Sequence, residues 1–210
     1  LDLLPSDAGK FINILFEAIP ILITSDSNIK NLEILLQKPE IVTQYDNFTR
    51  CFALACRYSP EAIKLLLKTN KVDLCNCYDT IKIRDENGVE NYIANYVQIA
   101  CRYNPESLKE LINNIPDLTD ALNEINIDNK DRHFNAFVLA IMYEPDAIKY
   151  LLTSKYLTPN YIQQTSQIIG TSCIQFAFET QIGSFTHIAL SKNSNFTPKP
   201  KQIIFTVALS

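Results

Sequence analysis

Apolar residues recur at helical spacing in three stretches of the chain. Each stretch has apolar residues at positions i, i+3 and i+4: Ile63, Leu66 and Leu67; Leu108, Leu111 and Ile112; Ile148, Leu151 and Leu152. This spacing places the apolar side chains on one face and predicts three amphipathic helices. Lys64, Lys109 and Lys149 occupy one equivalent position, which we expect to face solvent because burial of an unpaired charge is costly.

These helices belong to a longer segment that occurs three times. The stretch Ala55–Lys64 recurs as Ala100–Lys109, 45 positions later, and again as Ala140–Lys149, a further 40 positions along. Self-similarity at such a period is the sequence signature of repeat architectures. We therefore interpret each copy as one structural unit.

A proline corner predicts where the second helix of each unit starts. In the first corner Ser59 is a good helix cap, Pro60 suits the first helical position, and Glu61 is favoured by the helix dipole. The corner at 104–106 repeats every role. The third corner has Glu144 in place of a good cap, which should weaken that helix start by about 0.5–2 kcal/mol.

The first helix of each unit is predicted to be short and to end at the repeated tyrosine. These helices are expected at Arg50–Tyr58, Asn95–Tyr103 and Asn135–Tyr143. A small residue occupies the same height in each helix, namely Ala55, Ala100 and Ala140. Small side chains at a fixed height let neighbouring units approach closely. This pattern favours a stacked array.

Divergent copies extend the pattern towards both ends. Leu32, Leu35 and Leu36, with Asn28 at the cap position, predict a degenerate opening repeat whose first helix lies within Gly9–Pro20. A fourth candidate unit pairs the segments 172–180 and 183–190, while 193–200 predicts a loop and 203–209 half of a truncated repeat. The chain thus divides into a capping repeat at 1–47, repeats at 48–190, and a loop with a truncated repeat or cap at 191–210.

The unit resembles the ankyrin repeat, in which a turn or finger precedes a short inner helix and a longer outer helix. The likeness is carried by Leu54–Cys56, by the run Ala62–Leu67 and by the turn signal Asp85–Gly88. The chain departs from the family in three ways: it lacks the Thr-Pro-Leu-His signature, has a Ser/Asn-Pro-Glu corner instead of a glycine corner, and has a longer period. Armadillo- or HEAT-like repeats have periods of this length, but their helices are longer than the inner segments here.

The resemblance implies an all-α fold, an ankyrin-like helical repeat solenoid of about four to five helix-turn-helix units. Extra residues would lie in the fingers, where loop insertion costs little free energy. The proline corner, long fingers and Asn/Ile/Lys/Tyr-rich composition are similar to ankyrin proteins of large DNA viruses and AT-rich protists.

Charge and hydropathy exclude two classes of partner. The formal net charge is −4 and there is no dense Lys/Arg stripe, so we expect no nucleic acid partner. No window holds the roughly 20 apolar residues of a membrane helix, so we expect no membrane partner either. Most of the six cysteines lie in helix-like segments, which favours a reducing, intracellular setting, namely the cytoplasm, or the host cytoplasm for a viral protein. Because the sequence opens at Leu1, we expect it to be part of a longer polypeptide.

The sequence offers little catalytic chemistry. His133 lies in a charged turn, and His187 has no acid nearby in sequence. Cys75 and Cys77 lack the second ligand pair of a structural zinc site, and the four glycines form no phosphate loop. We therefore predict no catalytic, cofactor-binding or metal-binding residues and no enzyme; an enzyme would require a reactive thiol.

The family resemblance implies a protein-protein interaction module, an adaptor or scaffold whose partner is another protein of unknown identity. Such proteins bind through the exposed side of the inner helices and the finger tips. Repeat register puts four residues at outward positions, Ala53, Gln98, Val138 and Gln175, with Arg57, Arg102, Met142 and Glu179 one turn further on. The alternative is a structural or assembly component of a larger repeat protein or viral particle.

Candidate partner-binding residues are therefore Arg57, Arg102, Gln98 and Met142 in the groove, and Tyr78 and Asp79 in the long finger Asp73–Asn91. The paired arginines could clamp an acidic or backbone-rich partner bidentately, or they could be two solvated surface charges. The repeated tyrosine is interpreted mainly as a plug between units, with partner contact as the alternative.

Overall fold

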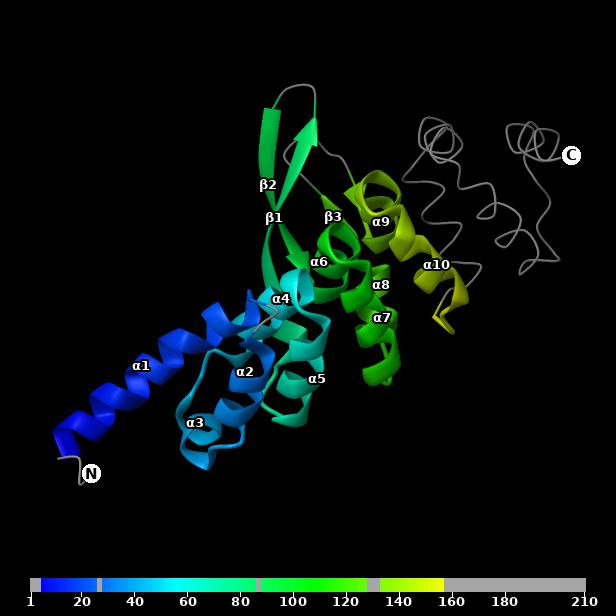
Figure 1. Ribbon diagram of the computed structural model, residues 1–210. Helices are drawn as coiled ribbons and strands as arrows, with labels where there is room; N and C mark the ends of the chain where they lie inside the picture. Colours follow the sequence, from blue (N-terminus) through cyan, green and yellow to red (C-terminus); the bar gives the residue numbers. More distant parts are fainter. Residues whose placement is uncertain (1–4, 26–27, 86–87, 128–132, 157–210) are drawn as a thin grey trace, which may run out of the picture.

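The described part of the chain is mostly helical (Figure 1). The computed structural model describes residues 5–25, 28–85, 88–127 and 133–156. The expected fourth unit at 172–190 and the segment 191–210 lie outside these residues, together with His187.

The three repeated segments form three pairs of helices joined by the proline corners. The pairs are α4 (Phe48–Tyr58) with α5 (Pro60–Lys68), α6 (Tyr96–Tyr103) with α7 (Pro105–Asn114), and α9 (Ala136–Tyr143) with α10 (Pro145–Thr153). The predicted helices at these positions are confirmed, with starts that differ by one or two residues from the sequence-based bounds.

The helix pairs lie side by side in two rows (Figure 1). The inner helix α6 contacts α4 on one side and α9 on the other, and the outer helix α7 likewise contacts α5 and α10. Small residues make this approach possible, because Ala55, Ala100 and Ala140 are all fully buried. The equivalent lysines Lys64 and Lys109 are about half exposed, which confirms the solvent-facing position.

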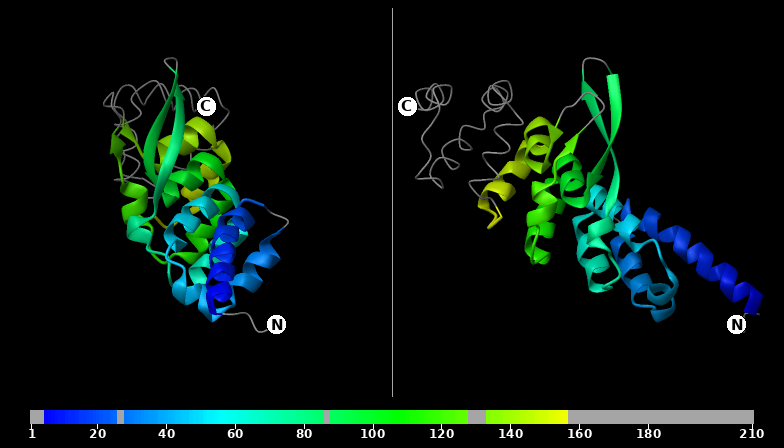
Figure 2. Two further views of the ribbon diagram at one scale, coloured as in Figure 1. Left: turned by 90° about the vertical axis from the view of Figure 1, so that its left-hand side faces the viewer. Right: turned by 180° about the vertical axis from the view of Figure 1, so that it is seen from behind.

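The N-terminal segment supplies a further pair of helices. Helix α1 (Pro5–Ile23) contacts α4, and α2 (Ile29–Leu36) contacts α5. Helix α1 extends beyond the expected Gly9–Pro20 at both ends, since it starts at Pro5 and continues through Pro20 to Ile23. The short helix α3 (Pro39–Gln44) was not expected. Figure 2 shows α1 extending away from the other helices towards the N-terminus.

The corners behave as their sequences predict. The side chain of Ser59 accepts a hydrogen bond from Ala62 N at 3.4 Å, and Asn104 accepts one from Ser107 N at 3.2 Å. Within the described residues, the side chain of Glu144 caps no backbone N–H of α10. The third outer helix therefore lacks a contact that stabilises the other two helix starts.

Two β-hairpins occupy the connections that the sequence analysis treated as fingers. Strand β1 (Tyr78–Asp85) pairs antiparallel with β2 (Gly88–Asn95), with Tyr78 opposite Asn95 and Asp85 opposite Gly88. Strand β3 (Asn126–Ile127) pairs with β4 (His133–Phe134). The turn before the second unit was predicted, but its strands were not. The short helices η2 (Leu74–Asn76) and α8 (Thr119–Asn123) lie just before the hairpins.

Candidate functional site

The inner-helix positions that register placed in an open groove are buried. Ala53 is 1% exposed, Gln98 0% and Val138 3%. The fingers contribute to this burial, since the β1–β2 hairpin packs against α4 and α6, while β4 and α8 pack against α9. The prediction that these positions are exposed on the surface is therefore wrong for the described units.

Gln98 is the centre of a polar network that joins the two fingers. Its side-chain oxygen accepts hydrogen bonds from Asn95 N at 3.1 Å and from Asn126 Nδ2 at 2.7 Å. Its amide nitrogen donates to the backbone oxygen of Glu124 at 3.0 Å. Asn95 completes a capping box at the start of α6 by accepting from Gln98 N at 2.9 Å. Gln98 thus holds the fingers in place and does not present itself to a partner.

Arg57 is engaged by its own chain. The guanidinium of Arg57 forms an ion pair with Asp79 at 3.1 Å and donates to Thr80 O at 2.7 Å. It also lies 4.4 Å from the ring centroid of Tyr103, and its side chain is 18% exposed. Arg57 is therefore neither a free clamp for a partner nor a solvated surface charge.

Arg102 repeats the arrangement one unit along. Its guanidinium lies 4.8 Å from the Tyr103 ring centroid and 3.6 Å from that of Tyr143, and it donates to Lys82 O at 3.4 Å. The hydroxyl of Tyr103 accepts from Lys82 N at 3.1 Å. We call Arg57, Tyr103, Arg102 and Tyr143 the arginine–tyrosine ladder; cation–π contacts of this kind stabilise by about 0.5–2 kcal/mol each.

The ladder closes the outer edge of β1. Backbone groups that point away from β2 would otherwise offer a template for another strand. Here Thr80 N donates to the carboxylate of Asp79 at 2.8 Å, Thr80 O accepts from Arg57, and Lys82 contacts the ladder through both its N–H and its carbonyl. Asp79 therefore helps to fix the position of the hairpin to which it belongs.

The remaining expected residues, Met142 and Tyr78, differ in exposure. Met142 is half-buried and packs against the core, so it offers little surface. Tyr78 is 42% exposed and its hydroxyl donates to Glu124 at 3.2 Å. Among the residues predicted to bind a partner, Tyr78 is the one most exposed to solvent.

Tyr78 belongs to a surface patch at the seam between the two fingers. Ile93 is 68% exposed and Ile125 is 38% exposed. Asn126 donates to Ile93 O at 2.7 Å, so these two isoleucines lie on either side of one inter-finger hydrogen bond. We call Tyr78, Ile93, Glu124, Ile125 and Asn126 the inter-finger patch.

Strand alternation places Tyr78 and Ile93 on one face of the hairpin. Thr80 lies opposite Ile93 and is also exposed, whereas Ile81 and Tyr92, one position along each strand, are 1% and 8% exposed. Ile93 is thus an apolar residue on the solvent-facing side of β2. The sequence reasoning missed it because the strand itself was not predicted; the alternation around Ile81 and Tyr92 was the available signal.

Glu124 carries the charge of this patch. One carboxylate oxygen accepts from Tyr78 and, at 2.7 Å, from Asn95 Nδ2. Partial burial and the neighbouring Glu124 carboxylate raise the pKa of Tyr78, which stays protonated as the donor. No Lys or Arg in the described part of the chain forms an ion pair with Glu124.

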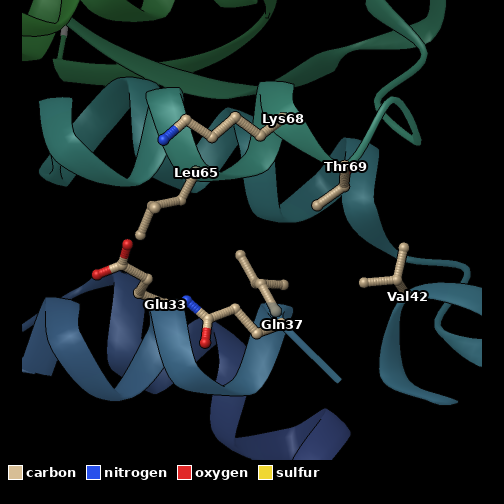
Figure 3. A pocket seen from close by; sticks show the side chains of 7 residues that line it. Glu33, Gln37, Val42, Leu65, Lys68 and Thr69 are labelled. Carbon is tan, nitrogen blue, oxygen red and sulfur yellow. The ribbon is translucent and has the colours of Figure 1, made fainter. Parts of the chain in front are cut away.

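A second surface feature lies on the outer-helix side, away from the fingers. A depression of about 330 Å³ separates α2 and α3 from α5 and is lined by residues of mixed character: Glu33, Leu36, Gln37, Val42, Leu65, Lys68 and Thr69 (Figure 3). The Thr69 hydroxyl donates to Leu66 O at 2.6 Å within its own helix end. The depression is a gap between packed helices with one carboxylate and one ammonium at its rim.

The buried thiols among the described residues are poor nucleophiles. Cys56, Cys77 and Cys101 are fully buried, and burial raises the pKa of Cys77 to about 12 and that of Cys101 further. Cys75 is exposed and so does not share a surface with Cys77.

Among the described residues there is no group of three or more potential metal ligands, and no described helix is long and apolar enough to span a bilayer.

No protein-family model matches the chain, and neither the curated proteins nor the solved structures contain a significant match to it. The assignment of function therefore depends on the geometry of the chain itself.

Proposed function

We propose that the chain is an ankyrin-like helical repeat solenoid that acts as a protein-binding adaptor or scaffold without catalysis of its own. Two rows of helices, small residues at the row contacts and fingers between units support the repeat assignment. Buried thiols of raised pKa support a non-catalytic role in a reducing compartment.

The observation that carries the proposal is the inter-finger patch. Exposed aromatic and aliphatic side chains on a rigid support are typical of energetically important binding residues. Tyr78 and Ile93 stand on a hairpin whose position is fixed by the ladder on one side and by the fully buried Gln98 on the other. The binding surface is thus the finger side of the array, in place of the inner-helix groove.

Random dodecapeptide phage display on the immobilised chain tests this proposal. We expect selection of peptides that bind saturably, and we expect Ile93→Asp to abolish that binding because it places a charge in the patch. Ile34→Asp is the matched control, since Ile34 is an exposed isoleucine on α2 at 58% exposure, remote from the fingers. Binding that survives Ile93→Asp, or a failure to select any saturable ligand, would contradict the proposal.

A second candidate, an assembly component, is favoured by a different surface. Ile14, Ile21 and Ile34 are 62%, 65% and 58% exposed on α1 and α2, where the rows of helices end in the described residues. A further array packing there would continue both rows. Sedimentation velocity distinguishes the two functions: assembly predicts concentration-dependent association that Ile34→Asp removes and Ile93→Asp leaves unchanged.

A further inference from the structure

The inter-finger patch combines apolar surface with a carboxylate that has no cationic partner among the described residues. Glu124 accepts two hydrogen bonds on Oε2, while its Oε1 takes part in no hydrogen bond or ion pair among the described residues. Ile125 follows Glu124 directly in the chain, and Tyr78 binds the carboxylate from the hairpin. The charge is therefore flanked by exposed apolar groups.

The carboxylate is also held in one orientation. Asn95, which donates to it at 2.7 Å, is 2% exposed and is itself fixed by the capping box with Gln98. The same Asn95 amide donates to Ala121 O at 2.8 Å, so the donor cannot turn away easily. A partly buried carboxylate that is preoriented in this way binds a cation with less loss of side-chain entropy than a freely rotating surface acid.

We propose that the partner is a basic protein segment in which a Lys or Arg stands next to an aliphatic residue. The cation binds Oε1 of Glu124, and the aliphatic side chain covers Ile93 and Ile125. This inference rests on the proposed binding function of the patch and adds the chemistry of the segment it recognises. The formal net charge of −4 for the whole chain is consistent with a basic partner.

The test uses two synthetic peptides that differ only in charge. One has the sequence Thr-Leu-Lys-Thr-Leu-Lys-Thr, and the other carries Glu in place of each Lys. By fluorescence anisotropy we expect the basic peptide to bind the wild-type chain about tenfold more tightly than the acidic one, because a charge-assisted hydrogen bond contributes about this factor. We expect the preference to fall as salt is raised.

Glu124→Gln isolates the local charge from the general acidity of the chain. Glutamine keeps a side-chain oxygen for Tyr78 and Asn95 but removes the negative charge, so we expect most of the tenfold preference to disappear. Glu61→Gln, at an exposed position on α5, removes the same unit of charge elsewhere and should leave the preference nearly intact.

The outcomes separate this inference from the proposed function. Equal effects of the two glutamine substitutions, or no preference for the basic peptide in the wild-type chain, would overturn the basic partner. If display still selects peptides whose binding is lost in Ile93→Asp, the patch remains a binding site for a segment of different charge. If Ile93→Asp has no effect on either ligand, the proposed function fails as well.

Discussion

Single residues at the proline corners determine how well each outer helix begins. Ser59 and Asn104 adopt extended backbone angles and cap their helices, and both roles follow directly from residue type. Glu144 has a similar φ of −138° but gives no side-chain cap in the described α10. Local chemistry of this kind could be predicted from the sequence, because a cap contacts only residues two or three positions away.

Replacing Glu144 by Asn should stabilise the chain. Asparagine can accept the bond from the backbone of α10 that Glu144 leaves unmade, so we expect the free energy of unfolding to rise by about 1 kcal/mol in urea titrations. Asn104→Ala is the converse variant and should lower it by a similar amount. An unchanged or lower stability of Glu144→Asn would show that the third corner is limited by something other than its cap.

Buried thiols should make stability fall at alkaline pH. The pKa of Cys77 is raised by burial from 9.0 to about 12, so above pH 9 the unfolded chain releases a proton that the folded chain retains. The contribution of this thiol to the free energy of unfolding is complete below pH 9 and is lost as pH rises towards 12. Urea unfolding between these limits should show a decline that is shallower in Cys77→Ala, with a pH-independent offset for the lost packing.

Thiol accessibility should separate one described cysteine from the others. Cys75 is exposed, whereas Cys51, Cys56, Cys77 and Cys101 are buried. We expect iodoacetamide to modify Cys75 rapidly and the buried four only on the timescale of unfolding. Peptide mass spectrometry over time checks this order. Rapid modification of a buried cysteine would point to an accessible reactive thiol and would reopen the enzyme hypothesis.

At the scale of elements, the helices could be predicted from the sequence and the hairpins could not. Apolar spacing specifies an amphipathic helix by itself, whereas β1 and β2 obtain their burial from α4 and α6. For the same reason the exposure of Gln98 was predicted wrongly: its position on the helix was correct, but a finger closes over it. Contacts between elements distant in sequence leave little trace in local periodicity.

Removing one hydroxyl of the arginine–tyrosine ladder should increase the mobility of the hairpin. In Tyr103→Phe the acceptor for Lys82 N is lost, so we expect the Lys82 amide to exchange faster with deuterium and stability to fall by about 1 kcal/mol. Tyr58→Phe is the matched control at the equivalent repeat position, where the side chain is 46% exposed. Equal exchange of Lys82 in both variants would mean that the tyrosine does not anchor β1.

At the scale of the whole molecule, stacking makes each unit depend on its neighbours. Helix α6 contacts both α4 and α9, and the fully buried Ala100 sits where a larger side chain would force the row apart. The order of the units along the array followed from the repeat in the sequence. The identity of the exposed patch did not, because it depends on where two fingers meet.

Enlarging Ala100 should therefore affect more than its own helix. We expect Ala100→Leu to lower stability by about 1–3 kcal/mol through overpacking. Hydrogen exchange followed by mass spectrometry should show weaker protection in peptides of α4 and α9 as well as α6, since neighbouring units share one interface energy. Loss of protection confined to α6 would contradict such coupling.

The way in which the hairpin is held leaves its outward sequence largely unconstrained. Arg57, Tyr103 and Arg102 form hydrogen bonds to backbone groups of Thr80 and Lys82. Every residue except proline supplies both a backbone N–H and a carbonyl. The outward side chains of β1 and β2 can therefore be exchanged without loosening the hold on the strand. The same frame could carry many different recognition sequences, in nature or in a designed library.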